Sequence, residues 1–83
     1  MQYHRWGIRL VDSNGIKQYA IILGGTRIIF AGLGRGPTTW ETQKSARRTL
    51  RMDKAAYGPE WRLRQMHGMT ATEVKMNIEI TEA

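Results

Sequence analysis

Apolar and polar residues alternate along the first third of the chain, in three runs separated by short turn sequences. Alternation with a period of two is the pattern of a β-strand with one buried face. The pairs Asn14-Gly15 and Gly24-Gly25 stand between the runs, and both favour two-residue hairpin turns because their residues tolerate positive φ. The pattern predicts three antiparallel strands, whose inward-facing residues are Trp6, Ile8, Leu10, Tyr19, Ile21, Leu23, Ile28 and Phe30.

Two-residue turns also fix the pairing of the strands. They place Leu10 opposite Tyr19, and Tyr19 opposite Phe30, so that apolar residues meet on one face. The other face mixes arginines with apolar residues, and its expected members are Arg5, Arg9, Gln18, Ala20, Ile22, Arg27 and Ile29.

A helical period follows the third strand, over residues 38–57. Thr38 and Glu41 have the spacing of a capping box, and Gly58-Pro59 is a stop signal. Apolar residues repeat on one face of this helix, namely Ala46, Leu50 and Tyr57. The opposite face carries a basic stripe within an arc of about 120°, which consists of Lys44, Arg47, Arg48, Arg51 and Lys54.

Alternation returns after the helix, first around Trp61 and Leu63 and then from Val74 to Ile80. This indicates two more strands, so the predicted order is β-β-β-α-β-β. The fold class is α+β, a single compact domain over residues 1–83 with an antiparallel sheet packed against a single α-helix. The pattern leaves open whether the last two strands extend the first sheet.

Composition and charge narrow the function. The 83 residues include no cysteine, and no apolar run has the length of a signal peptide core or a membrane span. A domain this small without disulfides is typical of a reducing, intracellular compartment. The net charge is +6, which favours a polyanionic partner such as nucleic acid or an acidic protein surface.

The basic stripe is the first candidate site, because lysines and arginines at helical spacing can follow the phosphates of DNA or RNA. Arg35 lies in a glycine-rich loop, residues 32–37, which directly precedes the predicted helix. Free backbone N–H groups at a helix N-terminus can hold a phosphate there. The spacing matches neither the P-loop nor the dinucleotide-binding motif, which favours a flexible connection between strand and helix as the other interpretation. We therefore expect a non-enzymatic nucleic-acid-binding module without a cofactor, in which Arg35 joins the stripe.

The outward sheet face is the alternative interface, and we assign it Arg5, Arg9, Arg27, Ile22 and Ile29. We add Trp40, whose position fits either an exposed aromatic beside the stripe or a cap at one end of the core. A three-stranded sheet backed by one helix resembles the plan of the arm-binding domains of phage integrases, whose sheet enters the major groove. The alternative function is a small phage or mobile-element inhibitor or adaptor that docks on a host protein complex in the anti-CRISPR manner. A homodimer would also cover the isoleucines.

Catalysis and metal binding have no sequence support. Only two histidines are present, His4 and His67, and no cysteine or metal-binding motif accompanies them. The expected role of the methionines, among them Met52 and Met66, is to fill the core. We expect no enzymatic activity.

Overall fold

The computed structural model describes residues 2–22 and 27–79 of the chain. Its elements in order are β1 (Gln2–Val11), β2 (Lys17–Ile22), β3 (Ile28–Ala31), the 3-10 helix η1 (Leu33–Arg35), α1 (Gln43–Ala56), α2 (Gly58–Met66) and β4 (Thr70–Glu79). The predicted α+β class is confirmed. The prediction of a single helix is wrong, because the stretch around Trp61 forms a second helix instead of a strand. The Gly24-Gly25 turn, Leu23 and Ile80 lie outside the described residues.

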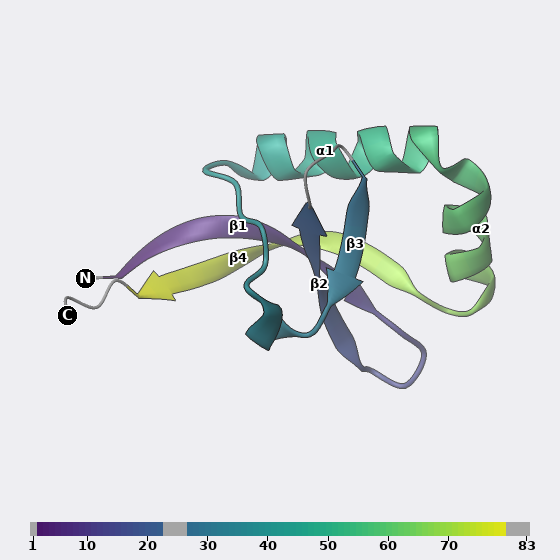
Figure 1. Ribbon diagram of the computed structural model, residues 1–83, viewed down its shortest axis with the longest axis horizontal. Coiled ribbons are helices and arrows are strands. Elements are labelled where there is room, and N and C mark those ends of the chain that lie inside the picture. Colours follow the sequence, from purple (N-terminus) through teal and green to yellow (C-terminus); the bar gives the residue numbers. More distant parts are fainter. Residues whose placement is uncertain (1, 23–26, 80–83) are drawn as a thin grey trace.

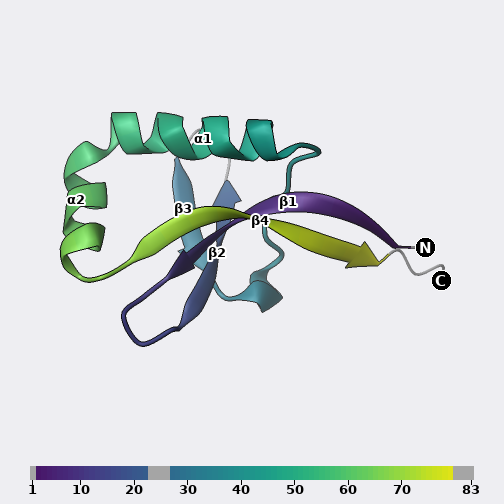
Figure 2. The same cartoon turned by 180° about the vertical axis from the view of Figure 1, so that it is seen from behind.

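The sheet is antiparallel, with the strand order β3-β2-β1-β4. β4 pairs with β1 along its whole length, from Gln2 opposite Glu79 to Val11 opposite Thr70. The last strand therefore extends the first sheet, which the sequence pattern had left open. Figure 1 shows β1 and β4 as one long ribbon, which β2 and β3 cross steeply. Figure 2 shows from behind that α1 lies above this sheet and that α2 turns down at its end.

A short segment before α1, residues 38–40, connects β1 and β2 where these two strands diverge. Trp6 and Trp40 exchange two backbone hydrogen bonds of 2.7 Å. Thr38 donates its N–H to the carbonyl of Ala20, and its side-chain oxygen accepts from the N–H of Ile22. The segment 38–40 thus lies between β1 and the end of β2, and it satisfies backbone groups that the diverging strands leave free.

The first hairpin has a longer turn than predicted, and this changes which face of β2 is buried. The N–H of Asp12 donates to the carbonyl of Ile16, and Gly15 has a φ of 81°, so the loop has three residues instead of two. The register is accordingly shifted by one, with Arg9 opposite Tyr19. One residue of shift turns every side chain of β2 to the other face.

The core confirms the predicted faces of β1 and β3 and corrects that of β2. Ala20, which was expected outside, is completely buried, and Ile22 packs against the core. Tyr19 and Ile21 instead share the face of Arg9, away from the helices. The buried apolar side chains are Ile8, Leu10, Ala20, Ile28, Ala46, Leu50 and Trp61, and they fill the layer between the sheet and the helices.

The ends of α1 also differ from the sequence prediction. The N-cap is Thr42, whose side-chain oxygen accepts a hydrogen bond of 3.1 Å from the N–H of Ser45. Thr38, the predicted cap, bonds to β2 instead. At the other end α1 stops at Ala56, as the Gly58-Pro59 signal predicts, but Pro59 then stands at the start of α2. Proline is well tolerated there, because the first turn of a helix needs no N–H from it.

Three residues that were expected to be buried, Met52, Leu63 and Met66, are exposed on the helices. Met52 and Met66 are exposed, so neither fills the core. Leu63, which a strand would have placed on the same face as Trp61, is 55% exposed on α2. In a helix two residues that are two apart point about 200° apart, so Trp61 can be buried while Leu63 faces solvent.

Candidate nucleic-acid interface

The outer face of α1 carries the basic stripe predicted from the sequence. All five of its side chains, Lys44, Arg47, Arg48, Arg51 and Lys54, belong to exposed residues. The inner face of the same helix buries Ala46 and Leu50 against the sheet. Because burial fixes the rotation of α1 about its axis, the stripe is held towards solvent. A surface hollow of about 630 Å³ runs along it, lined by Gln43, Lys44, Arg47, Arg48 and Arg51.

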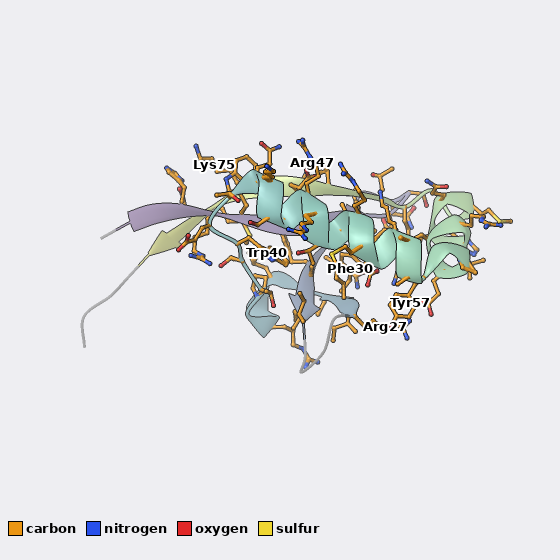
Figure 3. All side chains as sticks on the ribbon, turned by 90° about the horizontal axis from the view of Figure 1, so that it is seen from above. Arg27, Phe30, Trp40, Arg47, Tyr57 and Lys75 are labelled. Carbon is orange, nitrogen blue, oxygen red and sulfur yellow. The ribbon has the colours of Figure 1, made fainter. Side chains whose placement is uncertain are left out.

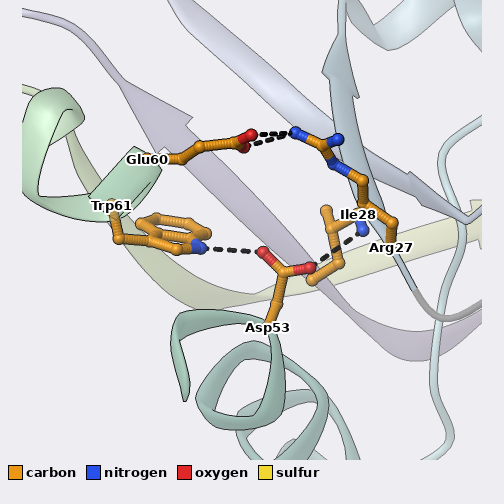
Figure 4. A network of polar contacts seen from close by, with 5 residues as sticks. All are labelled: Arg27, Ile28, Asp53, Glu60 and Trp61. Carbon is orange, nitrogen blue, oxygen red and sulfur yellow. Dashed lines mark hydrogen bonds and ion pairs between the residues drawn. The ribbon is translucent and has the colours of Figure 1, made fainter. Parts of the chain in front are cut away.

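A buried carboxylate fixes the position of α1. Asp53 is only 4% exposed and points away from the stripe into the core. Its carboxylate accepts a 3.1 Å hydrogen bond from the N–H of Ile28 and a 2.7 Å bond from the indole N–H of Trp61 (Figure 4). Asp53 therefore ties α1 to β3 and to α2 at once. The helical period of α1 gave no indication of this role, because it marks apolar positions and a buried carboxylate is not one of them.

Arg27 lies near Asp53 on the solvent side of the same contact between β3 and the two helices. Its guanidinium forms an ion pair with Glu60 and lies 4.7 Å from the centre of the Tyr57 ring (Figures 3 and 4). The hydrogen bond and the charge of Glu60 raise the pKa of Arg27. Arg27 is thus turned towards the helices, and the prediction that it belongs to the outward sheet face is wrong.

One member of the stripe is neutralised by an acid. The Nε–H of Arg47 donates a 2.6 Å hydrogen bond to a carboxylate oxygen of Glu73 on β4. Partial burial acts to raise the pKa of Glu73, but the hydrogen bond and charge of Arg47 outweigh it, and the net pKa is lowered. Arg47 nevertheless keeps 55% of its side chain exposed, whereas Glu73 keeps only 11%. Glu73 therefore holds the Arg47 side chain from the sheet side, and more than half of the arginine remains exposed to solvent.

The structure does not bring Arg35 to the stripe. Arg35 ends η1, which follows the end of β3 remote from α1 (Figure 1). The N-terminus of α1 begins only after Thr42, so the glycine loop does not adjoin its free N–H groups. The expectation of a phosphate held between this loop and the helix N-terminus is therefore wrong.

The alternative interface is only partly assembled. Ile22 and Trp40 are half-buried and pack against the core, so neither is an exposed contact residue. Arg5 lies on the face away from the helices, where its guanidinium donates to the side-chain oxygen and the carbonyl of Thr39. Arg9 lies on the same face, and its Nε is buried without a hydrogen-bond partner. Ile29 remains 41% exposed there, as predicted.

This uncovered face of the sheet is more apolar than the sequence indicated. The corrected register adds Tyr19 and Ile21 to it, and β4 adds Val74 and Met76. Gly7 makes room for Met76, since a Cβ at Gly7 would lie 2.3 Å from the Met76 sulfur. The sequence could not place Val74 and Met76 on this face without the pairing of β4, which has no signal in a local pattern.

The part of the chain that the structure describes offers little for other kinds of site. His4 and His67 lie at opposite ends of the β1–β4 ribbon, since His4 pairs with Asn77 and His67 precedes Thr70. Among the described residues no three potential metal ligands come together, and no helix there has the length and apolarity to cross a membrane. Comparison of the chain with protein-family models, curated proteins and solved structures gave no match.

Proposed function

We propose that this protein binds nucleic acid through the basic stripe of α1, without catalysing a reaction. The observation that carries the proposal is the arrangement of five cationic residues along one exposed helix face. Only Arg47 among them forms an ion pair within residues 2–22 and 27–79. Acids at helical spacing would neutralise the field of such a stripe, and the acid of α1, Asp53, is buried on the other side of the helix.

The dimensions of the stripe suit a phosphate backbone. Lys44 and Lys54 are ten residues apart, so the stripe is about 15 Å long at 1.5 Å per residue. One strand of a duplex rises about 3.4 Å per phosphate, so this length covers about four phosphates. Lysine and arginine side chains neutralise these charges and release bound counterions, which gives affinity without dependence on base sequence.

The test is fluorescence anisotropy with random-sequence duplex DNA, single-stranded DNA and RNA over a range of salt concentrations. Wild-type protein should show an affinity that falls with salt, with a slope of about −4 on a double logarithmic plot for a duplex. The double variant R48A/R51A should reduce the slope by about two, because it removes two phosphate contacts. Both side chains are exposed, so the fold should be unaffected.

A matched control separates the stripe from net charge. R35A/R62A removes the same charge from exposed residues outside the stripe, on η1 and α2. It should retain most of the wild-type slope. Equal losses in both variants would mean that binding follows total charge, and the stripe would then have no special role.

The second candidate function is docking on another protein through the uncovered sheet face, as an inhibitor or adaptor would. It is supported by the apolar residues of that face, where Ile29 is exposed on β3 and Arg9 lies on β1 next to Tyr19. Arginine next to apolar side chains is common in protein interfaces. Absence of nucleic-acid binding at physiological salt would favour this candidate, and I29S should then impair function more than R48A/R51A. Under either function we place the protein in a reducing, intracellular compartment, which the cysteine-free sequence supports.

A further inference from the structure

β4 lies at an edge of the sheet, and its backbone is available for pairing. The strand is ten residues long, and among the described residues it pairs only with β1. A long edge strand with free N–H and C=O groups is a template for another strand, and many proteins block it with a proline, a bulge or a covering loop. β4 contains no proline, and its ladder with β1 runs without interruption.

The hydrogen bonds of β1 identify which groups of β4 point outwards. The N–H and C=O of Trp6 both bond to Trp40, so they point away from β4. Because these directions alternate along an antiparallel strand, the neighbours of Trp6 point towards β4. They hold the even-numbered residues of β4, such as Val74 opposite Gly7. The backbone groups that face outwards therefore belong to Ala71, Glu73, Lys75 and Asn77.

We propose that β4 pairs antiparallel with β4 of a second copy of this chain, with Val74 opposite Val74 at the two-fold axis. A two-fold axis perpendicular to the sheet keeps the helices of both copies on one side. Residues opposite each other must then share a face, so only registers that shift the strands by whole two-residue steps are allowed. The charges on β4 distinguish between these registers.

Charge complementarity favours the register centred on Val74 over those centred on its two neighbours, Glu73 and Lys75. Glu73 and Lys75 are both on the helix side of the sheet, because they lie opposite Ile8 and Trp6. In this register each Glu73 lies opposite Lys75 of the other copy, so both pairs are attractive. Centring on Glu73 or on Lys75 would set like charges opposite each other. A lysine without an acidic neighbour would protect the edge against pairing with itself. Here Glu73 of one copy would supply an opposite charge for Lys75 of the other.

The same register matches the other face of the sheet. Thr72 would lie opposite Met76 of the second copy, on either side of the two Val74 side chains. The uncovered faces of the two copies would therefore join into one continuous surface. Arg47 and Lys75 lie along the same long side of α1 (Figure 3), and Arg47 bonds to Glu73 near the axis. The basic stripes of the two copies would thus flank the axis.

The proposal rests on the edge strand and not on nucleic-acid binding, so it is tested on the protein alone. Sedimentation velocity and light scattering should be measured over a wide concentration range, at about 0.15 M salt, where charges more than about 8 Å apart are screened. The wild-type mass should rise with concentration from 9.5 kDa towards twice that value. A wild-type mass that stays at 9.5 kDa at every concentration would overturn the proposal.

Charge-reversal variants test the register. K75E alone makes both cross-copy pairs acidic and should remain monomeric. E73K alone makes both basic and should also remain monomeric; since it removes the Arg47 ion pair as well, its circular dichroism must match that of the wild type for the result to count. An equimolar mixture of the two has only opposite charges across the interface and should regain the dimer mass. If the mixture instead behaves as the sum of its two components, the Val74-centred register is wrong.

Two further variants test whether the copies associate through the outward edge of β4. K75P removes one outward N–H without touching the ladder to β1, so it should abolish association while circular dichroism stays native. K17E makes the same charge change as K75E on β2, an interior strand, and should leave association intact. Association of K75P at wild-type strength would exclude the β4 edge. R48A/R51A should dimerise normally, which keeps this result separate from the test of nucleic-acid binding.

Discussion

Asp53 offers the sharpest test of how α1 is held. Its buried carboxylate accepts one hydrogen bond from Ile28 and one from Trp61. D53A removes both and leaves two buried donors without partners, at a cost of about 1.5–3 kcal/mol for each bond to a charged group. A chain of 83 residues has a total stability of about 4–12 kcal/mol. D53A should therefore be largely unfolded or close to its unfolding threshold.

D53N is the more informative substitution, because it keeps the shape. The amide oxygen of asparagine can accept one of the two hydrogen bonds, but its NH₂ group then meets the other donor. The substitution also removes the cost of burying a charge, so the net loss should be about 2 kcal/mol. Urea unfolding followed by circular dichroism and tryptophan fluorescence gives this difference from the midpoint and the slope.

A surface aspartate with the same chemistry is the control. Asp12 also accepts two backbone hydrogen bonds, from Asn14 and Ile16, but in an exposed turn. Both bonds end on the same oxygen, which asparagine retains, so D12N should cost about 0.5 kcal/mol or less. If D53N costs no more than D12N, the buried carboxylate does not anchor α1 and our account of the helix position is wrong.

Two further predictions concern the ends of α1 and its contact with β4. T42A should cost about 1 kcal/mol and T42S only a few tenths, because serine keeps the cap to the N–H of Ser45; equal unfolding midpoints for the two variants would contradict this. Since the pKa of Glu73 is lowered in the folded protein, its contribution is present above the ordinary value of 4.5 and is lost as the pH falls through the folded pKa. Wild type should therefore be more stable than E73Q by a constant amount from about pH 5.5 to 8, and the difference should shrink below about pH 4.5, whereas a difference independent of pH would refute the Arg47 ion pair as its source.

Local patterns predicted the parts of the fold that local physics decides. The alternation around Ile8 and Ile28 placed both residues in the core, and the helical period placed Ala46 and Leu50 there. The basic stripe followed from the same period. Which residues share a face depends only on the geometry of one strand or helix, so it can be predicted from a single sequence.

The errors arose where one residue or one distant contact decided the outcome. The third loop residue in the first hairpin reversed the faces of β2, which exchanged Ala20 for Tyr19 in the core. Four alternating residues around Trp61 fit a strand and a helix equally well, and Pro59 at a helix start was mistaken for a stop alone. Arg27 was assigned by alternation, but its ion partner Glu60 is 33 residues away.

The β1–β4 ribbon has a consequence for the order of folding. Residue 2 pairs with residue 79, so the first strand of the chain completes its hydrogen bonds only when residues 70–79 arrive. Contacts between such distant residues require the closure of long loops, which places this topology among slower-folding domains. During synthesis one edge of β1 therefore stays unpaired while β2, β3, α1 and α2 are made. It is paired only after β4 has been synthesised.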